Sequence, residues 1–180
     1  MIEVKELVKY IASIVLVIFV SFLLQTSVFP TFKLASVTPN LMVAVTTTYG
    51  LLRGRTQGMA VGFSCGIVLD FFSGYYLGFY ALVFLYLGFL SGLFKKLFFG
   101  DDFKLPMFLI GFVDVIYGVI IYFVFFLSQK DYSFGYFFMN LIMPEAVYTL
   151  IVGIFVYYII FKINVWLDKG KDRRQRKLVG

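Results

Sequence analysis

The sequence predicts an all-α integral membrane protein with six transmembrane helices. Three observations predict this class. First, 61% of the 180 residues are hydrophobic and only 14% are charged, whereas a soluble domain has about 45–50% apolar and about 25% charged residues. Second, the long apolar segments are apolar on all sides, which is typical of membrane helices and not of alternating barrel strands. Third, Lys and Arg are concentrated in alternate loops.

Six segments come close to the length and apolarity of a membrane helix, which needs about 20 residues. They cover residues 8–24, 40–52, 58–72, 77–94, 106–127 and 141–165. The first is expected to stay in the membrane, because no small-residue cleavage site follows Leu24. The second and third are short and are joined by residues 53–57 alone, so they are predicted to be thin, tilted or re-entrant. Trp166 is expected to anchor the end of the sixth segment at the membrane interface.

The distribution of positive charge predicts the topology. With a cytoplasmic N-terminus and six spans, fourteen of the sixteen Lys and Arg residues lie on the cytoplasmic side. Only Lys33 and Lys130 face outward, as the preference of Lys and Arg for cytoplasmic loops requires. An odd number of spans would place the basic C-terminal tail outside. We therefore expect both termini in the cytoplasm.

This topology divides the chain into two parts. Residues 1–166 are predicted to form a single six-helix transmembrane domain, and residues 167–180 a basic cytoplasmic tail. The tail carries Lys171, Arg173, Arg174, Arg176 and Lys177. It is expected to set the topology and to hold anionic lipid headgroups, with contact to a cytoplasmic protein as the alternative. No folded nucleic-acid-binding module accompanies it, so no nucleic-acid partner is predicted.

Glycines recur at every fourth residue in the middle of the chain. The candidates for helix packing or partner docking are Gly54, Gly58, Gly62, Gly66, Gly88 and Gly92. Small residues at this spacing share a helix face and let two helix backbones approach closely in lipid. Two interpretations stay open: packing within this chain, or a groove that docks the transmembrane helix of a partner.

Three acidic residues fall within or at the edge of predicted spans, and they are the candidates for a polar interior. They are Asp70, Asp114 and Glu145. Within the predicted spans Lys and Arg occur only near the helix ends, at Lys9 and Lys162, so none is expected to neutralise the acids, and a charge in lipid is costly. Asp114 is expected about 12 Å deep, and the three acids are expected to be separated from one another. Two interpretations stay open. The acids act either as caps and hydrogen-bonded groups, or as a polar interior that forms a small-molecule pocket or receives a hydroxyl or cation of a partner.

The sequence contains no His and a single Cys, Cys65. This composition excludes Ser-His-Asp and Cys-His catalysis, intrachain disulfides and Cys/His zinc sites. The phosphate-binding loop of nucleotide-binding proteins is also missing. We therefore predict a protein that is not an enzyme, with no catalytic residues, no cofactor and no metal.

Four blocks of sequence resemble a known family. They are QTSVFPTFKLASVTPNLM (residues 25–42), YGLLRGRTQGMAVGFSCGIVLDFFSG (49–74), LGFYAL (77–82) and PEAVYT (144–149). Together with the length and the six spans, they resemble the rod shape-determining protein MreD family.

The resemblance implies a non-enzymatic scaffold of the bacterial elongasome in the inner, or cytoplasmic, membrane. Such a scaffold binds MreC and links cytoplasmic MreB filaments to peptidoglycan synthesis for rod-shape maintenance. Through MreC it connects indirectly to RodA and a class B penicillin-binding transpeptidase. The resemblance also implies a fold similar to the S-components of energy-coupling-factor transporters.

Two other functions remain as alternatives. The first is an S-component-like subunit that binds or transports a small molecule or lipid. Such subunits typically carry small residues on the first helix, whereas here Ala12 and Ser13 are isolated among large side chains. The second is a lipid-modifying enzyme or flippase, which would need clustered acids, metal ligands or basic groups within the bilayer.

Overall fold

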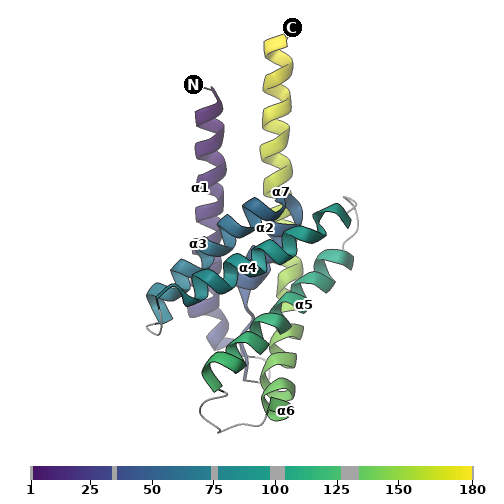
Figure 1. Ribbon diagram of the computed structural model, residues 1–180. Coiled ribbons are helices and arrows are strands. Elements are labelled where there is room, and N and C mark those ends of the chain that lie inside the picture. The colour runs from purple at the N-terminus through teal and green to yellow at the C-terminus, as the bar shows by residue number, and fades with distance from the viewer. Residues whose placement is uncertain (1, 34–35, 74–76, 98–103, 127–133, 180) are drawn as a thin grey trace.

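The structure is a computed structural model that describes residues 2–33, 36–73, 77–97, 104–126 and 134–179. Its secondary structure is helical, and each of the six predicted segments forms a helix (Figure 1). The α-helices are α1 (Ile2–Leu23), α2 (Leu41–Arg53), α3 (Arg55–Ser73), α4 (Phe79–Leu93), α5 (Lys104–Ile121), α6 (Phe134–Phe137) and α7 (Met143–Val179). The prediction of an all-helical membrane protein is confirmed.

Four helical segments in the described ranges are long and apolar enough to cross a membrane. They are Leu7–Thr31, Phe79–Leu97, Lys104–Val124 and Phe134–Asp168. The first continues α1 through a π-helical turn (Leu24–Val28) and a 3-10 turn (Phe29–Thr31). Helices α2 and α3 are not among the four. Helix α2 has 13 residues, which gives it a length of about 20 Å and makes it shorter than the membrane core of about 30 Å.

Helix α2 lies at the centre of the molecule. All of its residues from Leu41 to Leu51 are buried, and it contacts α1, α3, α4, α5 and α7. Three of the buried residues are the consecutive threonines Thr46, Thr47 and Thr48. A helix that is surrounded by other helices has no lipid-facing side to cover with large apolar residues. This position explains why the segment is unusually polar for a membrane helix.

The N-terminus and the C-terminus lie at the same end of the molecule, where α1 and α7 both project beyond the other helices (Figure 1). Helix α7 has 37 residues and is therefore about 55 Å long, well beyond the membrane core of about 30 Å. The basic tail predicted over 167–180 continues this helix as far as Val179. Helix α7 therefore extends into the aqueous phase at one end.

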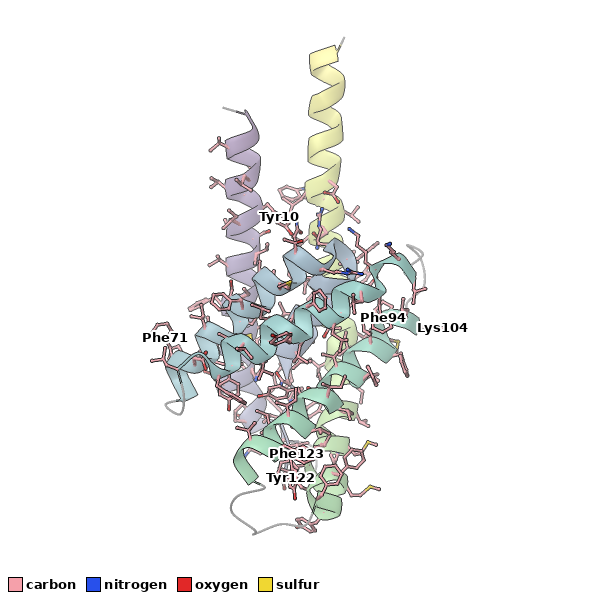
Figure 2. All side chains as sticks on the ribbon, in the orientation of Figure 1. Tyr10, Phe71, Phe94, Lys104, Tyr122 and Phe123 are labelled. Carbon is pink, nitrogen blue, oxygen red and sulfur yellow. The ribbon has the colours of Figure 1, made fainter. Side chains whose placement is uncertain are left out.

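The side chains between the helices are mainly aliphatic and aromatic (Figure 2). The main core contains Met42 and Tyr49 of α2, which pack with Phe84 of α4 and Leu109 of α5. A smaller aromatic cluster around Tyr122 lies at the end opposite both termini (Figure 2).

Candidate functional site

The glycines of α3 and α4 lie where these two helices cross. A Cβ added to Gly58 would lie 2.5 Å from Gly88 O, and one added to Gly92 would lie 2.5 Å from Arg55 Cα. A Cβ added to Gly62 would overlap Phe84 O. The groups beside these glycines are therefore mainly the backbone of this chain's own helices.

The remaining glycines of the repeat have two different surroundings. A Cβ on Gly66 would lie 2.5 Å from Ala81 N, so Gly66 extends the same α3–α4 contact. Gly54 has φ +97° and ends α2. That left-handed backbone conformation favours glycine. It lets α3 begin at the next residue, Arg55.

Asp70 binds the start of α4. Its Oδ1 accepts a hydrogen bond from Tyr80 N at 2.9 Å, and its Oδ2 accepts one from Ala81 N at 3.0 Å. The first N–H groups of a helix have no partner within the helix. A carboxylate from α3 supplies one here. Asp70 is buried, and it joins α3 to α4 at the end of the glycine contact.

Asp114 and Glu145 lie close enough to interact electrostatically, although 31 positions separate them in the sequence. Asp114, in the middle of α5, interacts electrostatically with Glu145 in the first turn of α7. Thr149, one turn further along α7, lies beside Asp114, and the side chain of Asn40 lies beside Glu145. We call these four residues the Asp114 cluster. The expectation of three separated acids is wrong for this pair, because the packing of α5 on α7 brings them together.

A second polar cluster joins four helices near the end where both termini lie. Arg53 Nε donates to Asn164 Oδ1 at 2.6 Å, and Arg53 Nη2 pairs with Asp168 Oδ1 at 3.1 Å. The Arg53 guanidinium also lies over the ring of Tyr10, at 5.3 Å from its centroid. Tyr10 OH in turn donates to Gln57 Oε1 at 2.6 Å. These contacts, which we call the Arg53 cluster, link α1, α2, α3 and α7.

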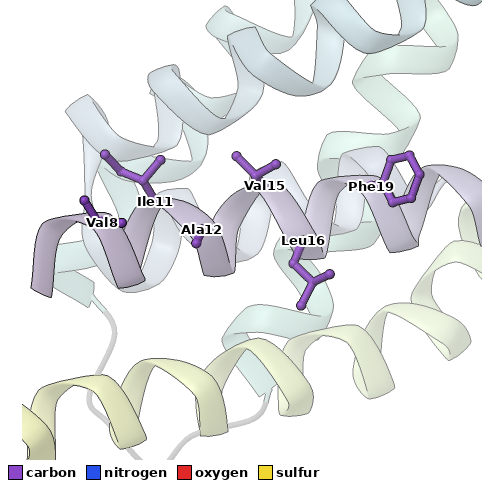
Figure 3. A pocket seen from close by; sticks show the side chains of 6 residues that line it. All are labelled: Val8, Ile11, Ala12, Val15, Leu16 and Phe19. Carbon is purple, nitrogen blue, oxygen red and sulfur yellow. The ribbon is translucent and has the colours of Figure 1, made fainter. Parts of the chain in front are cut away.

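Helix α1 exposes an apolar face along a shallow groove (Figure 3). The groove is lined by Val8, Ile11, Ala12, Val15, Leu16 and Phe19. Their spacing of three or four residues places them on one face of the helix. Val15 exposes 59% of its surface and Leu16 exposes 62%. This surface lies within a candidate membrane span, so a lipid or another helix covers it in a bilayer.

The Arg53 cluster and the contacts of Asn40 are not evident in the sequence. Arg53 is one of the fourteen Lys and Arg residues that indicate the topology, and nothing local shows that α7 brings Asn164 and Asp168 to it. Asn40 does have a local signal, because it follows Pro39 and precedes an apolar segment, as helix-capping residues do. Its Oδ1 accepts a hydrogen bond from Val43 N at 3.2 Å. The side chains of the basic residues predicted for the tail, from Lys171 to Lys177, lie outside the described residues.

The family comparison gives a match over most of the chain. The family described as rod shape-determining protein MreD matches residues 6–165. No curated protein and no solved structure matches, so the expected similarity to the S-component fold is unsupported. The match covers far more than half of the chain, and the helices and their apolar lengths agree with a multi-pass membrane protein. The chain belongs to the MreD family of rod shape-determining proteins, which are non-enzymatic membrane proteins of cell morphogenesis.

Proposed function

We propose that this protein is a scaffold of the bacterial elongasome that holds MreC in the membrane. Through MreC it would link cytoplasmic MreB filaments to peptidoglycan synthesis by RodA and a class B penicillin-binding transpeptidase. Membership of the MreD family carries this proposal. Its role in rod-shape determination follows from the family, and the partners are the proposed part.

The surface proposed to bind the MreC span is the exposed face of α1. The glycine-rich faces of α3 and α4 are in contact with each other, so a partner helix would have to displace one of them. Helix α1, in contrast, exposes Ile11, Val15 and Leu16 along the groove. Ala12 lies between them and has the small side chain that permits close approach of a second helix in lipid.

The proposed topology has six spans and both termini in the cytoplasm of a bacterial inner membrane. Helices α2 and α3 would supply the two crossings beyond the four long apolar segments. Both chain ends lie at one end of the molecule (Figure 1), as an even number of crossings requires. Arg53 and Lys95 lie together, because Lys95 Nζ donates to Arg53 O at 3.0 Å. The positive-inside preference places such residues in the cytoplasm.

The basic tail after residue 167 is proposed to contact anionic lipid headgroups beside the protein. It continues the long helix α7, and each Lys or Arg near an anionic surface contributes about 1 kcal/mol of attraction. This contact would hold the cytoplasmic end of α7 close to the membrane, where the filament system is assembled.

Co-purification with MreC tests the proposal. Val15→Trp places a large side chain in the groove of α1, whereas Val20→Trp places the same side chain at an exposed position of α1 outside the groove. We expect Val15→Trp to reduce the amount of MreC that co-purifies from detergent extracts, and Val20→Trp to leave it unchanged. Both variants must accumulate to the wild-type level in the membrane.

Two results would contradict the proposal at different levels. Recovery of the wild-type protein without MreC, from cells that contain MreC, would contradict the scaffold function. Equal co-purification of MreC by Val15→Trp and Val20→Trp would contradict only the choice of α1 as the docking face.

A further inference from the structure

The Asp114 cluster contains a buried carboxyl group without a partner. Asp114 is 3% exposed, and neither of its carboxyl oxygens has a hydrogen-bond partner among the described residues. The groups that interact with it are Glu145, Thr149 and Tyr117, and no Lys or Arg in the described part of the chain is among them. A buried polar atom without a partner costs about 1–3 kcal/mol, and more when the group is charged. Such a group generally has a water or an ion beside it.

The neighbours of Asp114 provide further oxygen atoms. Thr149 is fully buried, and its Oγ1 accepts a hydrogen bond from Asn40 N at 2.9 Å. The side-chain carbonyl of Asn40 accepts from Val43 N at 3.2 Å and keeps a second lone pair. Glu145 adds a second carboxyl group. Four side chains from the start of α2, from α5 and from α7 therefore bring oxygen atoms to one place.

The burial and composition of the cluster limit what it can bind. A position that is 3% exposed does not admit a side chain of another protein or an organic ligand. Mg²⁺ usually keeps several of its waters, and Ca²⁺ takes about six to eight oxygen ligands; a closed cluster of four side chains suits neither. A hard monovalent cation needs oxygen ligands and one balancing negative charge. The cluster supplies both when one of its two carboxyl groups is ionised and the other is protonated. Glu145 is partly exposed and offers a route of entry.

We propose that Asp114, Glu145, Thr149 and Asn40 form a binding site for one monovalent cation of the size of sodium. The bound ion would balance one ionised carboxylate between α5 and α7, with the other carboxyl group protonated, and would give Asp114 the partner that it lacks. It would also join the start of α2 to α7, in addition to the Asn40–Thr149 hydrogen bond. The site would therefore stabilise the half of the molecule away from the termini. This proposal does not depend on the binding of MreC.

Thermal unfolding of the purified full-length protein in detergent tests the site. The probe is NaCl, compared with choline chloride at the same ionic strength and pH. We expect the apparent Tm to rise with the logarithm of the Na⁺ concentration once this exceeds the dissociation constant, because an ion that binds only the folded state stabilises it increasingly as its concentration rises. Asp114→Asn and Thr149→Val are both expected to abolish this Na⁺-dependent rise, so the test still works if one of them does not fold. Asp70→Asn changes an acid outside the cluster and should retain it.

A direct measurement and two contrary outcomes complete the test. Equilibrium binding of radioactive Na⁺ should show about one ion per chain for the wild type and none for Asp114→Asn. Identical Tm values in NaCl and choline chloride would overturn the proposal. So would a Tm that depends on pH but not on Na⁺, because the carboxyl groups would then carry protons in place of a metal cation.

Discussion

Replacement of Gly62 by alanine is expected to weaken the packing of α3 on α4. The new Cβ would overlap Phe84 O and would lie 2.8 Å from Phe84 C and 2.9 Å from Thr46 Cγ2. The first two of these atoms belong to the backbone, so no rotation of a side chain can relieve the contact. Helices α3 and α4 would have to separate by about 1 Å to restore van der Waals distances.

The size of the effect follows from two opposing contributions. Overpacking of a close contact costs about 1–3 kcal/mol, while alanine gains up to about 1 kcal/mol over glycine in helix propensity. A net destabilisation of about 1–2 kcal/mol is expected, which corresponds to a Tm that is lower by about 2–8 °C for a chain of this size.

The assay is thermal unfolding of the purified protein in detergent, followed by intrinsic fluorescence. Gly135→Ala serves as the matched control, because a Cβ at Gly135 would meet nothing within 4 Å. We expect Gly135→Ala to melt at or slightly above the wild-type temperature. If Gly62→Ala melts at the same temperature as Gly135→Ala, the close contact between α3 and α4 does not limit stability and the reasoning is refuted.

Three further predictions concern the ends of the helices and the topology. Asp70→Ala should lower the Tm more than Asp70→Asn does, because the amide oxygen can still accept one of the two hydrogen bonds from the start of α4; equal losses would show that these bonds contribute little. Arg53→Ala should cost about 1–3 kcal/mol in the same assay, mainly through its bond to the buried Asn164, and high salt should not reproduce this loss. In a Cys65→Ala background, Gly180→Cys should react with a membrane-impermeant thiol reagent only after the cytoplasmic side is opened. Ser128→Cys should react in intact spheroplasts, and the reverse pattern would exclude the proposed topology.

The sequence alone was sufficient to predict the class of protein and the positions of its helices. A continuous apolar segment can satisfy its backbone in lipid only as a helix or within a closed barrel, so composition and length are nearly decisive. The same reasoning located the six helical segments, and the motif blocks led to the MreD family that the comparison supports.

The tertiary structure decided which side chains meet. The spacing of the glycines predicts that they share a helix face, but it does not predict which helix packs against that face. Only the tertiary structure shows that Gly58 lies against Gly88. Likewise, the sequence spacing of Asp114 and Glu145 says nothing about their distance, which depends on how α5 crosses α7. The central position of α2 was also outside the reach of the sequence, because a short polar segment is compatible with a thin span, a re-entrant loop or a helix enclosed by others. A helix forms from the residues of one local segment, so the local sequence pattern predicts it. A contact between two helices depends on the angle and position at which they cross, and these are set by the packing of segments that are far apart in the sequence.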